Sequence, residues 1–273
     1  MKSASRRTRG NPLNALLVLG TAAVVFFAFY ARQSANEFLY RPPPSFNYER
    51  NEDFQFISSE DGTKIHVFWA ADSEATRTVL YFCGSSEDLP AAMPLLRSYQ
   101  LRGFNVASFE YRGFGYSEGK PNQAALFEDG AAVYDFIAKE VGGDESSIIL
   151  HGHSVGGAVA MEIATRIKPG GIILESSFTS AYNVLLGMDW IPGDLYRNKA
   201  KAENIACPVL LIHGEDDAVV PLSDAVDLAN SFGDENLSRY IVPDGGHADL
   251  PATAGIGYWS SIESFVRKLN SGG

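Results

Sequence analysis

The 273-residue sequence has only two cysteines, Cys83 and Cys207, which are too few for a disulfide framework. Each lies beside an apolar run, so we interpret both as small residues at strand boundaries. The sequence also contains no CxxC pair and no HExxH string, the usual signatures of zinc sites. We therefore expect no metal, and nothing in the sequence implies an organic cofactor.

Basic residues are scarce beyond the amino terminus. The first 41 positions hold six of the 22 Lys and Arg residues but only one of the 33 acidic residues, so the remainder carries 16 basic against 32 acidic residues. Such a surface repels phosphate backbones, and we expect no binding of nucleic acid by the folded domain. The 45% hydrophobic and 20% charged residues are typical of a globular protein. The sequence does not indicate an oligomeric state.

One long apolar run is present, the 19 uncharged positions from Leu13 to Ala31. A helix of that length spans nearly the ~30 Å hydrocarbon core of a bilayer. A buried core helix is one alternative and a cleaved signal peptide is another. The run is longer than a usual signal-peptide core, however, and no clear AxA site follows it. An uncleaved transmembrane signal anchor is therefore our interpretation.

The charges around this run predict its orientation. Four basic residues precede it, whereas only Arg32 and Arg41 follow it within the first 41 positions. The positive-inside tendency places the amino terminus in the cytoplasm and the folded domain on the non-cytoplasmic side of the membrane. The predicted organisation is a basic cytoplasmic tail (1–12), a single-pass transmembrane signal anchor (13–31), a linker (32–50) and one folded domain (51–273).

From Phe54 onward, short β-rich runs alternate with longer amphipathic stretches, the pattern of βα units in a mainly parallel sheet. The later strands are apolar without alternation, as expected when helices cover both faces. An Asp-Gly pair at 61–62 indicates a hairpin turn. We predict an α/β fold, a three-layer α/β/α sandwich around an eight-stranded, mostly parallel sheet. The expected strands are 54–57, 64–69, 78–83, 104–109, 147–150, 171–174, 208–213 and 239–242, with helices around 90–102, 122–140, 155–167, 222–232 and 256–269.

The strand expected at 147–150 runs into His-Gly-His-Ser-Val-Gly-Gly. Gly152, Ser154 and Gly156 therefore satisfy the pattern GxSxG between a strand and a helix, where the serine is exposed on a sharp turn. A glycine-rich loop with a bystander serine is the alternative. A serine hydroxyl is a weak nucleophile at neutral pH, so this interpretation requires a base and a third group that orients the base.

Five histidines compete for the role of base, and His247 is the best candidate. It lies in a loop after the last expected strand, where two preceding glycines give the backbone freedom to bring the imidazole over the serine. The others lie in or beside expected strands, where structural or packing roles are the default. They are His66, His151, His153 and His213.

Candidates for the orienting acid follow the strand expected at 208–213. Asp216 and Asp217 lie at its carboxyl end, where active sites of open α/β sheets form. Adjacent side chains point in different directions, so only one of the two aspartates should contact the histidine. The chemical properties of the residues alone do not decide which one. Glu175, at the end of another expected strand, is a third candidate.

Three segments together resemble the α/β-hydrolase superfamily of serine hydrolases. They are Gly-His-Ser-Val-Gly, His-Gly-Glu-Asp-Asp-Ala-Val-Val-Pro and Gly-Gly-His-Ala-Asp-Leu, and the resemblance runs from about Phe38 to the end of the chain. In the family pattern HGxxDxxVP the aspartate is the fifth position, which is Asp217 here. The resemblance thus implies Ser154 as nucleophile, His247 as base and Asp217 as orienting acid, in the chain order of this fold.

The segment Cys-Gly-Ser-Ser-Glu-Asp at 83–88 resembles the oxyanion loop of the superfamily. Cys83 and Ser85 stand where the family commonly has histidine and asparagine. Backbone donors survive such side-chain changes, so the resemblance implies that the amides of Ser85 and Val155 stabilise the developing oxyanion.

Within the superfamily, the sequence resembles membrane-anchored members with a minimal cap, including acyl-protein thioesterases and lysophospholipid hydrolases. Only about thirty residues separate the strands expected at 171 and 208, too few for a large lid. The resemblance implies hydrolysis of ester or thioester bonds in small-molecule, acylated or lipid-like substrates through an acyl-enzyme. A serine peptidase of the same fold and a noncatalytic binding protein are the alternatives. Apolar residues of the short cap are expected to line an open site or to pack onto the sheet: Leu185, Leu186, Trp190 and Leu195.

Overall fold

The computed structural model describes residues 39–43, 48–188 and 191–271. The predicted cytoplasmic tail (1–12) and signal anchor (13–31) lie outside these residues. Within the described ranges, no helix combines the length and apolarity that a membrane crossing requires.

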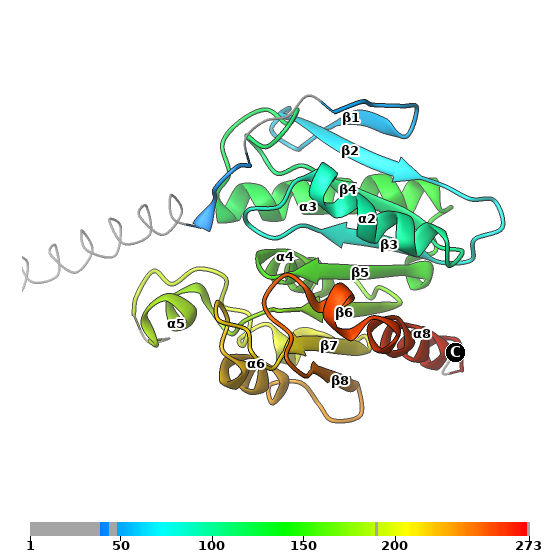
Figure 1. Ribbon diagram of the computed structural model, residues 1–273. Helices are drawn as coiled ribbons and strands as arrows, with labels where there is room; N and C mark the ends of the chain where they lie inside the picture. The colour runs from blue at the N-terminus through cyan, green and yellow to red at the C-terminus, as the bar shows by residue number, and fades with distance from the viewer. Residues whose placement is uncertain (1–38, 44–47, 189–190, 272–273) are drawn as a thin grey trace, which may run out of the picture.

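A single twisted sheet runs through the centre of the domain (Figure 1). It has eight strands in the order β1-β2-β4-β3-β5-β6-β7-β8, and six of them, β3 to β8, are parallel. The predicted eight-stranded, mostly parallel sheet is therefore confirmed. The strands are β1 (Phe54–Ser58), β2 (Lys64–Ala70), β3 (Thr78–Phe82), β4 (Asn105–Phe109), β5 (Ile148–His153), β6 (Gly171–Glu175), β7 (Val209–Gly214) and β8 (Leu237–Val242).

The antiparallel part of the sheet begins with the predicted hairpin. β1 and β2 pair from Phe54 opposite Phe68 to Ser58 opposite Lys64. Gly62 in the connecting turn has φ +86°, a conformation that a residue without a side chain adopts readily. β2 then pairs antiparallel with β4, which joins this hairpin to the parallel strands.

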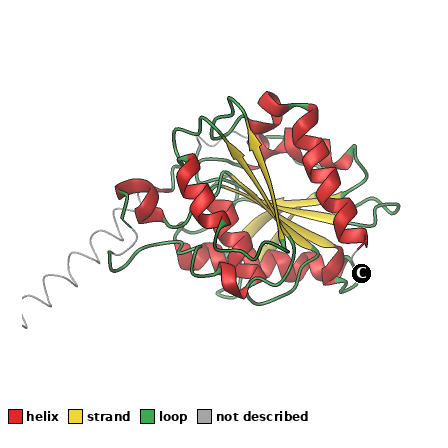
Figure 2. Ribbon diagram, turned by 90° about the horizontal axis from the view of Figure 1, so that it is seen from below, coloured by secondary structure: helices red, strands yellow, loops and turns green. Residues whose placement is uncertain are grey.

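Helices cover both faces of the sheet, as the apolar strands predict (Figure 2). On one face α2 and α8 touch, with the rings of Tyr99 and Trp259 5.2 Å apart. On the other face α3 and α4 pack so closely that a Cβ on Gly130 would lie 2.6 Å from Val159. The helices are α2 (Leu89–Gln100), α3 (Gln123–Glu140), α4 (Val155–Ala164), α5 (Ala181–Leu186), α6 (Leu222–Ala229), α7 (Leu250–Ala254) and α8 (Ile256–Ser271), with short 3-10 turns at Glu145–Ser147 and Ala202–Asn204.

The strand order determines where a site can form. After β3 the chain adds β4 on one side and then β5 on the other, so the direction of winding reverses at β3. In open α/β sheets ligands bind beyond the carboxyl ends of the strands at such a reversal. The loops after β3, β5, β7 and β8 meet at this edge of the sheet.

Candidate active site

Ser154 lies at the turn between β5 and α4, with φ 53° and ψ −117°. A non-glycine residue rarely has a positive φ, and such strain persists only where the surroundings enforce it. Gly156 shows how tightly this turn packs, because a Cβ there would lie 2.0 Å from the carbonyl oxygen of Phe82. The amide of Ser154 also donates a 2.8 Å hydrogen bond to the carbonyl of Glu175 on the neighbouring strand. The turn thus lifts the hydroxyl above the carboxyl edge of the sheet.

The structure brings Ser154, His247 and Asp217 together. His247 Nε2 lies 3.1 Å from Ser154 Oγ, and His247 Nδ1 lies 2.8 Å from Asp217 Oδ2. Because a carboxylate only accepts hydrogen bonds, the proton of neutral His247 resides on Nδ1. Nε2 is then free to accept the hydroxyl proton of Ser154.

Local hydrogen bonds explain why Asp217, and not its neighbour, meets His247. Oδ1 of Asp217 accepts from the amides of Val219 and Val220, both at 2.8 Å, which leaves Oδ2 for the imidazole. Burial by itself would raise the pKa of Asp217, but the hydrogen bonds from His247 and these two amides lower it. Asp216 is exposed and lies outside this network.

Glu175, the third candidate for the acid, is not brought to His247. Its Oε2 lies 3.0 Å from His151 Nε2 and accepts a 2.6 Å hydrogen bond from the hydroxyl of Tyr258. Burial would raise the pKa of Glu175, but these contacts lower it, so the group is a buried carboxylate at the end of β6. The default structural roles of His66, His151 and His213 agree with their positions, because all three are fully buried.

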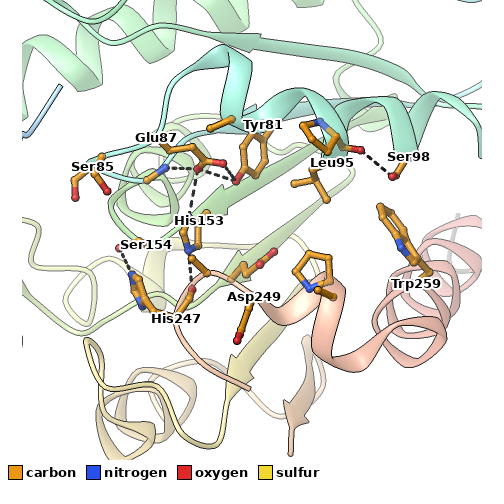
Figure 3. Close-up of a pocket in the computed structure, with 18 residues that line it drawn as sticks. Tyr81, Ser85, Glu87, Leu95, Ser98, His153, Ser154, His247, Asp249 and Trp259 are labelled. Atoms are coloured by element: carbon orange, nitrogen blue, oxygen red, sulfur yellow. Dashed lines mark hydrogen bonds and ion pairs between the residues drawn. The ribbon is translucent and has the colours of Figure 1, made fainter. Parts of the chain in front are cut away.

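His153 has a more specific position than the packing role expected of it. Its Nε2 lies 2.9 Å from the backbone carbonyl of His247, and its Nδ1 lies 3.3 Å from Oε2 of Glu87 (Figure 3). Since both nitrogens face acceptors, both carry protons and the ring is an imidazolium. Burial opposes this charge, but Glu87, Glu175 and the carbonyl of His247 raise the pKa of His153 to about 9.

Glu87 connects this imidazolium to the predicted oxyanion loop. Its carboxylate accepts a 2.9 Å hydrogen bond from the amide of Gly84 and bonds from the hydroxyl of Tyr81. A Cβ on Gly84 would lie 2.9 Å from His153 Nδ1, so a larger residue there would displace the ring of His153. The ion pair of His153 with Glu87 therefore ties the end of β5 to the loop after β3, and the hydrogen bond of His153 to the carbonyl of His247 ties it to the loop that carries the base.

Ser85 and Val155, the predicted oxyanion residues, both border an opening in front of Ser154. Ser85 follows β3 and is half-buried, and Val155 is the first residue of α4. The carbonyl of Cys83 accepts a 2.5 Å hydrogen bond from the buried Tyr111 hydroxyl, which fixes the chain just before this loop. Two backbone amides at such positions suit a developing oxyanion.

Two cavities open at Ser154 and His247. The larger, about 660 Å3, extends between α2, α7 and α8 (Figure 3). It is lined by three carboxylates, Glu87, Glu175 and Asp249, and reaches Trp259. The smaller, about 210 Å3, extends toward α5 and is lined mainly by aliphatic and aromatic residues.

The cap between β6 and β7 is short, with α5 and one 3-10 turn in its described part. Of the residues expected to line the site, Leu185 borders the smaller cavity and Leu186 is 54% exposed. Leu195 is fully buried, so of the two alternatives it packs in the core. Trp190 lies outside the described residues.

The chain is similar to several known proteins. The family model described as "Serine aminopeptidase, S33" matches residues 73–191. The uncharacterized protein YfhR of Salmonella typhimurium is 30% identical over 217 residues, which are 71% of this chain and 73% of that protein. A lysophosphatidylserine lipase, ABHD12 of Danio rerio, is 33% identical over 143 residues, which cover 44% of this chain and 37% of the lipase.

Solved structures share the fold at low sequence identity. The esterase Pf2001 of Pyrococcus furiosus superposes with a TM-score of 0.70 at 17% identity, covering 84% of this chain and 99% of the esterase. The esterase RhEst1 of a Rhodococcus species gives 0.62 at 19% identity, covering 80% of this chain and 99% of that chain. At these low identities the similarity shows a shared fold only.

Proposed function

This chain belongs to the α/β-hydrolase superfamily and is a serine hydrolase of that fold, and from this premise we propose that it cleaves carboxylic ester or thioester bonds of acyl or lipid-like substrates. The observation that carries the proposal is the unbroken hydrogen-bond line from Ser154 through His247 to Asp217, at the junction of two cavities. A substrate with a reactive carbonyl at Ser154 would have space on both sides of the bond that breaks.

The proposed reaction has two halves. His247 Nε2 takes the proton of Ser154 as the oxygen attacks the carbonyl, and Asp217 stabilises the imidazolium that results. The amides of Ser85 and Val155 stabilise the oxyanion. His247 then protonates the leaving group, an acyl-enzyme forms on Ser154, and water activated by His247 releases the acid.

Labelling with a fluorophosphonate probe tests this proposal. We expect rapid modification of the wild-type chain and none of Ser154→Ala, because the probe reacts only with an activated serine. Replacing Ser154 or His247 by alanine should lower turnover of p-nitrophenyl butyrate by about a thousandfold or more. A wild-type chain that neither reacts with the probe nor hydrolyses the ester would refute the proposal.

A serine peptidase activity is the second candidate, favoured by the description of the matching family model and by the carboxylates of the larger cavity. These carboxylates could form ion pairs with the free ammonium group of a peptide, on either side of the bond that is cleaved. A panel of matched esters, thioesters and aminoacyl amides separates the two. Preferential cleavage of the amides would replace our ester or thioester assignment.

We also propose that residues 13–31 anchor the enzyme in a membrane, with the catalytic domain on the non-cytoplasmic side. The uncharged run and the four basic residues before it support this. A reporter that is active only in the cytoplasm, fused to the carboxyl terminus, should give no signal. Strong reporter activity would reverse the proposed orientation.

A further inference from the structure

The smaller cavity at Ser154 differs from the larger one in its chemistry. Most of its lining is apolar and it contains no carboxylate, whereas the larger cavity is lined by three carboxylates and no lysine or arginine. An acyl chain favours the apolar side, because moving its methylene groups out of water is favourable. The apolar lining consists of Leu39, Val155, Phe178, Ala181, Val184, Leu185, Val219 and Val220.

The size of this cavity limits how much of an acyl chain it holds. Its volume of about 210 Å3 is below the ~300–1,000 Å3 of sites that enclose a drug-sized ligand. A long chain must therefore continue past the mouth, where α5 and the turn after it expose Leu185 (36%), Leu186 (54%) and Met188 (40%). Val219, which follows β7 and also lines this cavity, is 55% exposed. In water such a rim leaves apolar surface uncovered.

The connection to the amino-terminal run places this rim near the proposed membrane. Leu39 lines the cavity and follows Ala31, the last residue of the apolar run, by eight residues. Eight residues span at most about 29 Å when fully extended. A folded domain of this length is on the order of 45 Å across. The eight residues that connect Ala31 to Leu39 therefore span less than the width of the domain. The surface around Leu39 must lie close to the proposed anchor.

Figure 1 shows α5 and the segment that starts at residue 39 at the same end of the domain. The arrangement is consistent with one surface that carries both the tether and the cavity mouth. The acidic excess beyond residue 41 disfavours attraction of the domain to an anionic lipid surface, so the exposed apolar residues of this face carry the inferred contact.

We propose that the rim formed by Leu185, Leu186, Met188 and Val219 rests on the lipid bilayer, and that the acyl chain of the substrate enters the smaller cavity directly from that bilayer. The inference rests on the proposed hydrolase function and anchor, and it identifies the substrate as a membrane-resident acyl compound. A longer acyl chain then stays in contact with lipid or protein along its whole length during the reaction.

A fluorescent label tests the contact without relying on activity. The full chain is reconstituted in phosphatidylcholine vesicles with NBD on Leu186→Cys or, as a control, on Leu101→Cys. Leu101 is 88% exposed at the end of α2, on the opposite edge of the sheet, and native Cys83 and Cys207 are buried and shielded from the label. We expect a blue shift and quenching by spin-labelled lipid at position 186 alone. Emission typical of water at position 186 would overturn the proposal.

A second experiment measures the consequence for hydrolysis. The double variant Leu186→Ser and Met188→Ser, which leaves the cavity lining intact, should cleave p-nitrophenyl palmitate embedded in the same vesicles roughly tenfold more slowly or worse. It should retain the wild-type rate with p-nitrophenyl butyrate in water, which shows that the variant is folded. Leu101→Ser should leave both rates unchanged.

The outcomes separate this proposal from the proposed function. If butyrate hydrolysis depends on Ser154 but the double variant cleaves embedded palmitate at the wild-type rate, the hydrolase function stands and the membrane-facing rim is refuted. If Ser154→Ala hydrolyses butyrate as fast as the wild type, the hydrolase function itself fails.

Discussion

Removing the charge on His153 should weaken catalysis in a way that depends on pH. The imidazolium donates to the carbonyl of His247 and to the carboxylate of Glu87, and so holds the loop that carries the base. A hydrogen bond from a charged donor contributes about 1.5–3 kcal/mol, which corresponds to a roughly 10- to 150-fold effect. We expect His153→Ala to lower kcat by a factor in this range with little change in KM.

The sign of the pH dependence follows from the raised pKa. The pKa of His153 rises from an ordinary 6.5 to about 9, with Glu87, Glu175 and the carbonyl of His247 opposing the effect of burial. The interaction is therefore complete below about pH 6.5 and is lost as pH rises through about 9. The difference in pKa corresponds to about 3 kcal/mol of stabilisation in the neutral range.

The assay is kcat against pH from 6 to 10, with p-nitrophenyl butyrate as substrate and fluorophosphonate labelling rates as a second readout. Wild-type activity should fall near pH 9, and this alkaline decline should disappear in His153→Gln, whose amide donates to the carbonyl of His247 without titrating. His151→Gln is the matched control, because His151 lies on the same strand and makes no hydrogen bond to His247. An unchanged kcat and an unchanged alkaline decline in His153→Ala would refute this reasoning.

Two further predictions concern the acid and the fold. Asp217→Asn should lower kcat by about a thousandfold or more, because the amide no longer holds the tautomer of His247 that accepts the serine proton. Asp216→Asn is the control and should match the wild type. Equal losses of kcat in the two variants would contradict the geometry. Arg112→Ala should cost about 3–5 kcal/mol of folding stability, since it leaves the fully buried carboxylate of Asp129 without its cation. Thermal unfolding checks this, and Arg166→Ala, which removes an exposed ion pair, should cost less than about 1 kcal/mol.

Much of the fold followed from local patterns in the sequence. All eight strands lie within two residues or so of their expected positions at the amino end, because apolar β-rich runs are bounded by turn residues. β5 is longer than expected at its carboxyl end and continues to His153, because Gly152 and His153, just before the turn at Ser154, still pair with β6. A pattern of apolar residues alone could not reveal that pairing.

The site required more than local patterns. Residue physics could not choose between Asp216 and Asp217, because the choice depends on the amides of Val219 and Val220 that bind one oxygen of Asp217. The link from Glu87 through His153 to His247 joins residues 66 and 94 positions apart in sequence, so no local pattern could have found it. The sequence offers one hint of this link, the acidic residue Glu87 in the loop after β3.

The separation of the cap from the reacting groups affects how this enzyme could diversify. Ser154, Asp217 and His247 follow β5, β7 and β8, whereas the segment between β6 and β7 supplies none of them. Its turn at Gly187 has open space around it. Insertions there would alter which molecules gain entry while the reaction itself continued unchanged, so new specificities can arise by lengthening a single surface loop.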